Sequence, residues 1–287
     1  DGRLIDIASI RQAEVLVEKA KLIEGKWFLS KMQNFLDFEK PLLDIQAKME
    51  ELRHLKDTSE NIANELSNLQ DKFDKKLYEI YEDLTPFQKV KVCRHQDRPK
   101  FDDIVEKIFD KAEYLSGDRL YADDTSLKGC LTKIEDKKFL VIGNDKGKDI
   151  DSRVKNNFGM AKPEGYRKAQ RLFKIASKFN IPIVTFIDTP GAFPGVEAED
   201  RGQSEAIASS IKNSLSVNSP IFSFVIGEGG SGGAVAMGMG NKVVMLEHSI
   251  YSVISPEGCA SILWRSINHS EKAAENLKLT AQDLFEL

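Results

Sequence analysis

Short apolar runs alternate with helical patterns in the second half of the chain, and this alternation restricts the possible folds more than any other feature. The runs are rich in Val, Ile and Phe: FLVIG (139–143), IPIVTFID (181–188), PIFSFVIG (220–227) and KVVMLE (242–247). Amphipathic helical patterns separate the first three runs, one beginning at Pro163 and one over 201–217. Buried strands joined by crossover helices predict an α/β fold with parallel strands. The even spacing of the first three runs suggests a repeated ββα unit.

A long apolar stripe at helical spacing occupies the first half of the chain. From Pro41, apolar residues recur at intervals of three and four, and after Thr58 and Ser59 the stripe continues to Leu84. Such a stripe predicts a helical hairpin or a coiled coil. Because a helical apolar stripe is normally buried, we assign it to packing against its partner helix or another subunit rather than to a cofactor.

Composition and charge argue against several classes of protein. The chain has 287 residues, of which 41% are hydrophobic and 30% are charged, and its net charge is −4. It therefore lacks the basic excess of a nucleic-acid-binding protein, and no apolar run approaches the length of a membrane span. The three cysteines and four histidines are scattered, so we expect no disulfide framework, no metal site and a reducing compartment.

The densest cluster of glycines, GEGGSGGAVAMGMG (227–240), follows the third apolar run. Its first six residues fit the dinucleotide-binding pattern G-x-G-x-x-G, but the segment behind them offers only about two helical turns, too few for the crossover helix of that fold. The cluster is not a phosphate-binding P-loop, because Gly233 and Ala234 stand where Lys and Ser or Thr are required.

Two interpretations of the glycine cluster stay open. Backbone N–H groups at a strand-to-helix turn can stabilise an oxyanion, helped by the positive end of the helix. Alternatively, the glycines only let a helix pack closely on the sheet.

Two further loops follow apolar strands, at the edge where open α/β sheets bind ligands. Their candidate substrate-binding residues are Gly191, Pro194 and Gly195 in the loop over 188–203, and Pro256, Glu257 and Gly258 in the loop over 251–264. Glu257 lies near a predicted helix start, where the helix dipole favours a carboxylate. We prefer that explanation of Glu257 to a role as catalytic acid.

Six collinear motifs extend over most of the chain: FLDFEKP (35–41), GDRLYADD (117–124), NNFGMAKPEGYRKA (156–169), FIDTPGAFPGVEAEDRGQSEAIA (186–208), VIGEGGSGGAVAMGMG (225–240) and YSVISPEGCASILW (251–264). Together they closely resemble the carboxyltransferase alpha subunits of bacterial-type, multi-subunit acetyl-coenzyme A carboxylases. The resemblance runs from about Met32 to the last residue. It implies an α/β, crotonase-like fold of the ClpP/crotonase superfamily, with a repeated ββα core and an N-terminal helical hairpin.

The resemblance also implies a division of the chain. Residues 1–31 have no counterpart in the family and are expected to be an extension. Residues 32–85 are expected to form the helical hairpin, and 86–287 the crotonase-like carboxyltransferase domain. Family members usually continue beyond the position of Leu287, so we expect a truncated C-terminus.

Members of this family transfer a carboxylate from carboxybiotin, borne on a biotin carboxyl carrier protein, to acetyl-CoA. The product is malonyl-CoA, in the first committed step of fatty acid synthesis in the cytoplasm. The resemblance therefore implies a beta subunit as partner, in an α2β2 heterotetramer, and a biotin carboxylase that uses ATP in a separate step. It implies no covalently bound cofactor in this chain.

The family's oxyanion hole maps onto the backbone of Gly232 and Gly233, which the resemblance assigns to the ureido oxygen of biotin. The beta subunit would then hold the enolate of acetyl-CoA. Gly229, Gly230 and Ser231 are expected to contact substrate, with Gly229 and Gly230 shaping the turn that aims the two N–H groups. Two alternatives are another crotonase-fold acyl-CoA enzyme, either a carboxyltransferase or a decarboxylase, and a non-catalytic scaffold whose helical hairpin organises partners.

Overall fold

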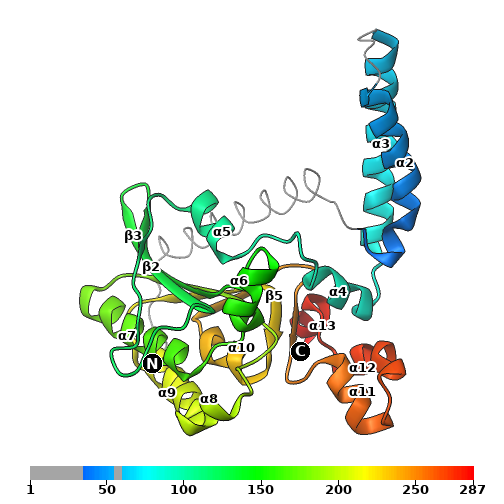
Figure 1. The fold of residues 1–287 in the computed structure, drawn as a ribbon. Helices are drawn as coiled ribbons and strands as arrows, with labels where there is room; N and C mark the ends of the chain where they lie inside the picture. The colour runs from blue at the N-terminus through cyan, green and yellow to red at the C-terminus, as the bar shows by residue number, and fades with distance from the viewer. Residues whose placement is uncertain (1–34, 55–59) are drawn as a thin grey trace.

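A computed structural model describes residues 35–54 and 60–287 of the chain (Figure 1). The predicted extension over 1–31 and the predicted break at Thr58 and Ser59 lie outside the described residues. The predicted α/β architecture is confirmed, since a mixed sheet is covered by helices on both faces.

The described part of the chain contains one seven-stranded sheet, in the order β1-β2-β3-β4-β5-β6, with β7 pairing with β5. Its strands are β1 (Glu113–Tyr114), β2 (Leu127–Ile134), β3 (Lys137–Asn144), β4 (Ile183–Thr189), β5 (Ile221–Gly230), β6 (Lys242–Met245) and β7 (Ile250–Ser252). Strand β2 is antiparallel to both of its neighbours, β1 and β3, and the pairs from β3 onward are parallel. The four predicted apolar runs are therefore the parallel strands β3 to β6.

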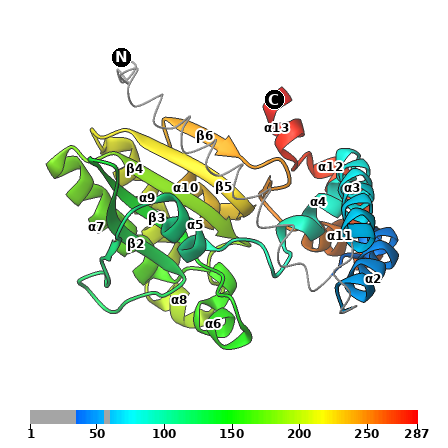
Figure 2. The same ribbon diagram turned by 90° about the horizontal axis from the view of Figure 1, so that it is seen from above.

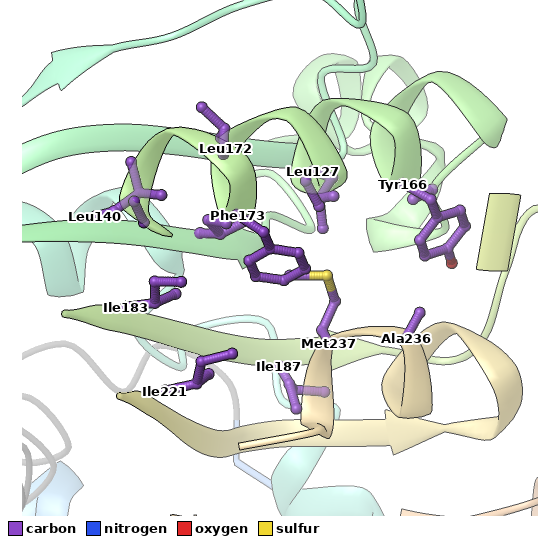
Figure 3. Packing of buried hydrophobic residues seen from close by; sticks show 14 of the residues in the cluster. Leu127, Leu140, Tyr166, Leu172, Phe173, Ile183, Ile187, Ile221, Ala236 and Met237 are labelled. Carbon is purple, nitrogen blue, oxygen red and sulfur yellow. The ribbon is translucent and has the colours of Figure 1, made fainter. Parts of the chain in front are cut away.

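Alternate residues of each strand point to opposite faces of the sheet. On β3, Leu140 and Ile142 join one core with the helices α7 (Pro163–Phe179) and α10 (Ser231–Gly238), while Phe139 and Val141 join a second core. Figure 3 shows the first core, where Phe173 of α7 packs toward the strands and Met237 of α10. Burial on both faces explains why these strands are continuous apolar runs in the sequence.

One helix covers the second face, and another extends the layer over the first. Helix α5 (Phe101–Ile108) packs on the second core, and α9 (Gln203–Ser216) packs on α7. The remaining elements are α4 (Pro86–Cys93), α6 (Ile150–Lys155), α8 (Val196–Asp200), α11 (Pro256–Trp264), α12 (Ser270–Leu277), α13 (Ala281–Glu286) and the 3-10 turns η1 (Asp37–Glu39), η2 (Asn157–Gly159) and η3 (Ile267–His269). Figure 2 shows α4 and α11 to α13 on one side of the sheet.

The apolar stripe of the first half forms two antiparallel helices, α2 (Lys40–His54) and α3 (Glu60–Glu82), which project from the body (Figure 1). Leu42, Met49 and Phe73 are buried in the seam between them, as a helical stripe predicts. At the foot of the hairpin the Tyr81 hydroxyl donates to Glu39 at 2.6 Å. The Tyr81 ring meets the His248 ring edge-on, with centroids 5.3 Å apart. The division of the chain into domains stays a prediction.

In the part of the chain that the structure describes, no helix combines the length and the apolar composition needed to cross a lipid bilayer.

The junction at His248 makes stability depend on pH. Burial lowers the pKa of His248 to about 4, and the Nδ1 atom is buried without a hydrogen-bond partner. The unfolded chain, with an ordinary histidine pKa near 6.5, binds more protons between these two values, so the folded state loses stability as pH falls through this window. We expect wild type to lose roughly 1–2 kcal/mol more than His248→Gln between pH 7 and pH 5.

Chemical denaturation at several pH values measures this difference. The matched change at the exposed His269, His269→Gln, is expected to keep the wild-type pH profile. Identical pH profiles for wild type and His248→Gln would contradict the interpretation.

Candidate functional site

Three loops meet at the carboxyl ends of the parallel strands. Strand β5 pairs with β4 through Thr189 and Gly229, and with β7 through Gly230 and Ser252. The glycine turn, which we define as residues 229–233, is therefore flanked by the loop that follows β4 and the loop that follows β7. These are the three loops that the sequence predicts, and the sheet register brings them together.

The glycine turn is a sharp strand-to-helix connection. Strand β5 ends at Gly230 and helix α10 begins at Ser231, which has φ +49°. This left-handed conformation usually selects glycine, but here a serine adopts it, and Gly230 is extended at φ −92°. The first N–H groups of a helix have no intrahelical acceptor and lie at its positive end. Ser231, Gly232 and Gly233 are the residues that provide these groups in α10.

Close packing explains two of the glycines. A Cβ atom added at Gly230 would lie 2.2 Å from the carbonyl oxygen of Pro190, and one at Gly233 would lie 2.7 Å from the carbonyl carbon of Gly191. The backbone of the glycine turn thus rests directly on the backbone of the loop after β4. Gly229 is similarly constrained, because a Cβ there would lie 2.4 Å from the Tyr251 ring. The close-packing interpretation of the cluster holds for these three residues.

Gly232 and Gly191 differ from them, because an added Cβ would meet only ordinary van der Waals contacts at Gly232 and open space at Gly191. A Cβ at Gly232 would have its nearest neighbours 3.7 Å away, in the side chain of Ile207, and a Cβ at Gly191 would have no neighbour within 4 Å. Gly191 also has φ +153°, which side chains rarely allow. Space therefore lies beside Gly191, on the loop against which the start of α10 packs. This is the arrangement that the oxyanion interpretation needs.

The loop after β4 is held in place by Gln203. Its side-chain amide, which is buried, donates to the carbonyl oxygens of Ala161 and Phe193, both at 2.9 Å. Pro194 and Gly195, both predicted to contact substrate, lie farther along this loop. Pro194 is exposed, and Gly195 precedes α8 against the ring of Phe193.

The loop after β7 ends at the start of α11. Ser255 caps this helix by accepting from the N–H of Gly258 at 3.1 Å, and Pro256 occupies the first turn. The Glu257 carboxylate accepts from the guanidinium of Arg94 at 2.8 Å. Burial raises the pKa of Glu257, but the hydrogen bond and charge of Arg94, together with hydrogen bonds from the helix start and Ser255, lower it below its ordinary value, so the group stays charged. Its predicted contact with substrate stays a prediction.

Charged residues that the sequence reasoning missed lie directly behind the glycine turn. Lys146 Nζ is 2.8 Å from Asp188 Oδ1 and 2.5 Å from Glu228 Oε2. Arg94 Nε is 2.6 Å from Glu228 Oε1. With Glu257, these residues form a chain of alternating charge, which we call the charged chain: Asp188, Lys146, Glu228, Arg94 and Glu257. One signal was present in the sequence, since Asp188 and Glu228 each end an apolar run.

Burial and neighbouring charge act in opposite directions on the charged chain. Burial raises the pKa of Asp188, but the ammonium of Lys146, and beyond it that of Lys100, lowers it below its ordinary value. Burial lowers the pKa of Lys146, but Asp188 and Glu228 raise it above its ordinary value. Both groups are therefore charged at neutral pH, and each depends on the other to remain so.

In residues 35–54 and 60–287, no three His, Cys, Asp or Glu side chains gather closely enough to hold a metal ion.

Solved structures with the same fold define the class. The chain is similar to transcarboxylase 12S, solved with methylmalonyl-coenzyme A and methylmalonic acid bound. Their TM-score is 0.57 at 21% identity, covering 71% of this chain and 40% of that one. It is also similar to the beta subunit of geranyl-CoA carboxylase from P. aeruginosa, with a TM-score of 0.50 at 21% identity, covering 62% and 34%. The fold is therefore crotonase-like, as predicted.

Sequence comparison then gives the family. The family described as acetyl co-enzyme A carboxylase carboxyltransferase-like matches residues 35–287, and the chain belongs to it. It is 55% identical over 255 residues to the acetyl-coenzyme A carboxylase carboxyl transferase subunit alpha of Rhodospirillum centenum, covering 88% of this chain and 80% of that protein. The protein of the same name from Paramagnetospirillum magneticum is 54% identical over 255 residues, with the same coverage. The family resemblance inferred from the motifs is confirmed.

Substitutions at the closely packed Gly233 and at the less crowded Gly232 are expected to change stability differently. Gly233→Ala places a methyl group against the backbone of Gly191, so we expect the free energy of unfolding to fall by about 1–3 kcal/mol. Gly232→Ala meets only ordinary contacts and gains helix propensity, so we expect a change within about 1 kcal/mol. Urea denaturation of both variants tests this, and equal losses at the two positions would show that the close approach at Gly233 has been misassigned.

Proposed function

We propose that this chain is the alpha subunit of a two-subunit carboxyltransferase, which moves a carboxyl group from carboxybiotin on a carrier protein to acetyl-CoA. Family membership supports a carboxyltransferase. The structural observation that carries the assignment of the site is the position of Gly232 at the positive end of α10, where an added Cβ would meet nothing closer than 3.7 Å, near the open space at Gly191. In this space a backbone N–H can meet a negatively charged oxygen.

The reaction needs groups that stabilise negative charge on oxygen atoms, and it needs no protein nucleophile. Carboxybiotin supplies the carboxyl group: its N–C bond breaks, a C–C bond forms at the methyl carbon of acetyl-CoA, and a proton from that carbon passes to the biotin nitrogen. Negative charge develops on the ureido oxygen and on the thioester oxygen as this occurs. Positioned donors can supply most of the catalysis in such a reaction.

The residues present fit the ureido oxygen of biotin. The donors are the N–H groups of Gly232 and Gly233, and the helix end behind them favours negative charge. We place the biotin ring beside Gly191, where an added Cβ would meet open space, and next to Gly232, where it would meet only ordinary contacts. Gly230, Gly233 and Gln203 support the two backbones that form the floor of this space. Gly229 and Ser231 complete the turn, and the loop residues Pro194, Gly195, Pro256 and Gly258 are proposed to border the substrate.

The proposal includes partners. The thioester oxygen needs a second set of donors, and we assign these to a beta subunit in an α2β2 assembly. A biotin carboxyl carrier protein would deliver the carboxybiotin, and a biotin carboxylase would consume ATP elsewhere. The projecting hairpin α2–α3 is proposed as a packing element of this assembly. A cytoplasmic location is proposed because Cys93, Cys130 and Cys259 are all free thiols, as is usual in reducing compartments.

Carboxylation of free biotin by malonyl-CoA, measured with the chain and its beta partner, tests this function. This is the reverse reaction, and it needs neither ATP nor the carrier. We expect wild type to be active and Gly232→Val to lower kcat by about 100-fold or more, because the side chain fills the space beside the donors.

The controls separate catalysis from assembly. Ala208→Val, an exposed substitution on α9, is expected to keep full activity, and size-exclusion chromatography should show that every variant still binds the beta subunit. An assembled Gly232→Val pair with wild-type kcat would refute the oxyanion assignment. An inactive wild-type pair would refute the proposed function itself.

A further inference from the structure

A bulge in β5 lies immediately before the glycine turn. Ile187 of β4 pairs with Val225 of β5, but the next pair is Thr189 with Gly229. Asp188 is therefore the single β4 residue that faces residues 226–228 of β5. Bulges bend a strand and re-aim the residues that follow, so this bulge sets the direction in which the chain enters the glycine turn.

The Asp188 carboxylate fills the bulge. It is buried, with 5% of the residue exposed, and its Oδ1 atom accepts from the backbone N–H of Glu228 at 3.0 Å. Gly227 makes room for it, because a Cβ there would lie 2.3 Å from the same oxygen. The Arg98 guanidinium donates to the carbonyl oxygen of Ile226 on the other side of the bulge. Charged side chains thus hold the backbone here in place of ladder hydrogen bonds.

The charged chain connects the bulge to two more elements. Lys146, which follows β3, contacts both Asp188 and Glu228. Arg94, which caps the end of α4, contacts Glu228 with Nε and Glu257 at the start of α11 with Nη1. Glu228, with a side chain 9% exposed, is held between the two cations. If either cation is removed, the largely buried Glu228 carboxylate keeps only one positive neighbour. We expect the backbone to shift until water can reach that carboxylate.

We propose that Arg94 and Lys146 are positioning residues for carboxyl transfer: by fixing Glu228 they set the bulge, and the bulge aims the N–H groups of Gly232 and Gly233. This inference rests on the proposed function. Neither cation needs to touch substrate. A displacement of about 1 Å in catalytic geometry can lower a rate by about 100-fold, and only Gly229, Gly230 and Ser231 separate Glu228 from the first proposed donor.

Arg94 is suited to this role in a way that lysine is not. Its planar guanidinium spans two carboxylates at once, whereas an ammonium on a flexible stem does not reproduce the fork. The structure offers a matched arginine elsewhere. Arg167 on α7 bridges Asp118 at 2.8 Å and Glu164 at 3.1 Å, with a side chain 14% exposed. Its hydrogen bonds go to Asp118, Glu164 and the carbonyl oxygen of Arg201, away from the bulge and the glycine turn.

The test compares Arg94→Lys with Arg167→Lys in the assembled pair with the beta subunit, using malonyl-CoA-dependent carboxylation of free biotin. We expect Arg94→Lys to lower kcat by about 10- to 100-fold, with the KM for malonyl-CoA within about twofold of wild type. Arg167→Lys is expected to lose comparable stability in urea, with kcat within about twofold of wild type. A purely structural role for Arg94 would instead lower stability in both variants and leave kcat alone.

A second variant covers the case in which Arg94→Lys does not fold or assemble. Glu257→Gln keeps the size and shape of the side chain and removes the negative charge at the more exposed end of the charged chain. We expect its kcat to fall by about threefold or more with KM unchanged, whereas a substrate-binding role for Glu257 would raise KM. Unchanged kcat in Arg94→Lys, or in Glu257→Gln when Arg94→Lys cannot be prepared, would overturn the proposal. Each variant's kcat is compared with that of the wild-type pair in the same assay. An inactive wild-type pair would therefore refute the proposed function, whereas unchanged kcat in the variants would refute only the positioning role.

Discussion

The buried contact between the Asp188 carboxylate and the end of β5 is the interaction on which the site depends. Asp188 accepts from the N–H of Glu228 and pairs with Lys146 at 2.8 Å; a neutral amide in its place could keep the hydrogen bond but not the ion pair. Desolvation opposes the charged form, and the neighbouring ammonium restores it. Gly227 is needed because the carboxylate occupies the place of its side chain. One ion pair therefore fixes a strand end, a bulge and the start of α10.

The glycine cluster then divides by physical role. Gly229, Gly230 and Gly233 allow other groups to approach closely, whereas Gly232 has room for a Cβ at the helix start. Close packing accounts for three of these glycines, whereas the oxyanion interpretation, which concerns Gly232, stays a proposal. Close packing makes the floor of the site rigid, and rigidity is what lets backbone donors act without reorganising during the reaction. This explains how a site can be built with few side chains that reach the substrate.

Much of the fold was predictable because its signals are local. The apolar runs from Phe139 and from Ile181 are buried on both faces of the sheet, and Pro163 marks the first turn of α7. Strand β2 was missed because LKGCLTKI mixes apolar residues with lysines and a glycine, without a regular pattern. The glycine turn was located correctly, but not its left-handed residue, because Ser231 adopts a conformation that sequence rules assign to glycine. The charged chain could not be predicted, because Arg94 and Glu228 lie far apart in the sequence and are brought together only by the folded sheet and α4.

Amide hydrogen exchange of Asp188→Asn in the assembled pair tests the central claim most directly. The amide keeps the size of the side chain and removes its charge, so Lys146 loses one of its two carboxylate partners and keeps Glu228, without any change in packing volume. The account predicts that the amides of residues 229–233 exchange about tenfold faster or more, while those of 183–186 and 221–225 remain as in wild type. Unchanged exchange at 229–233 would contradict the claim that this ion pair holds the glycine turn.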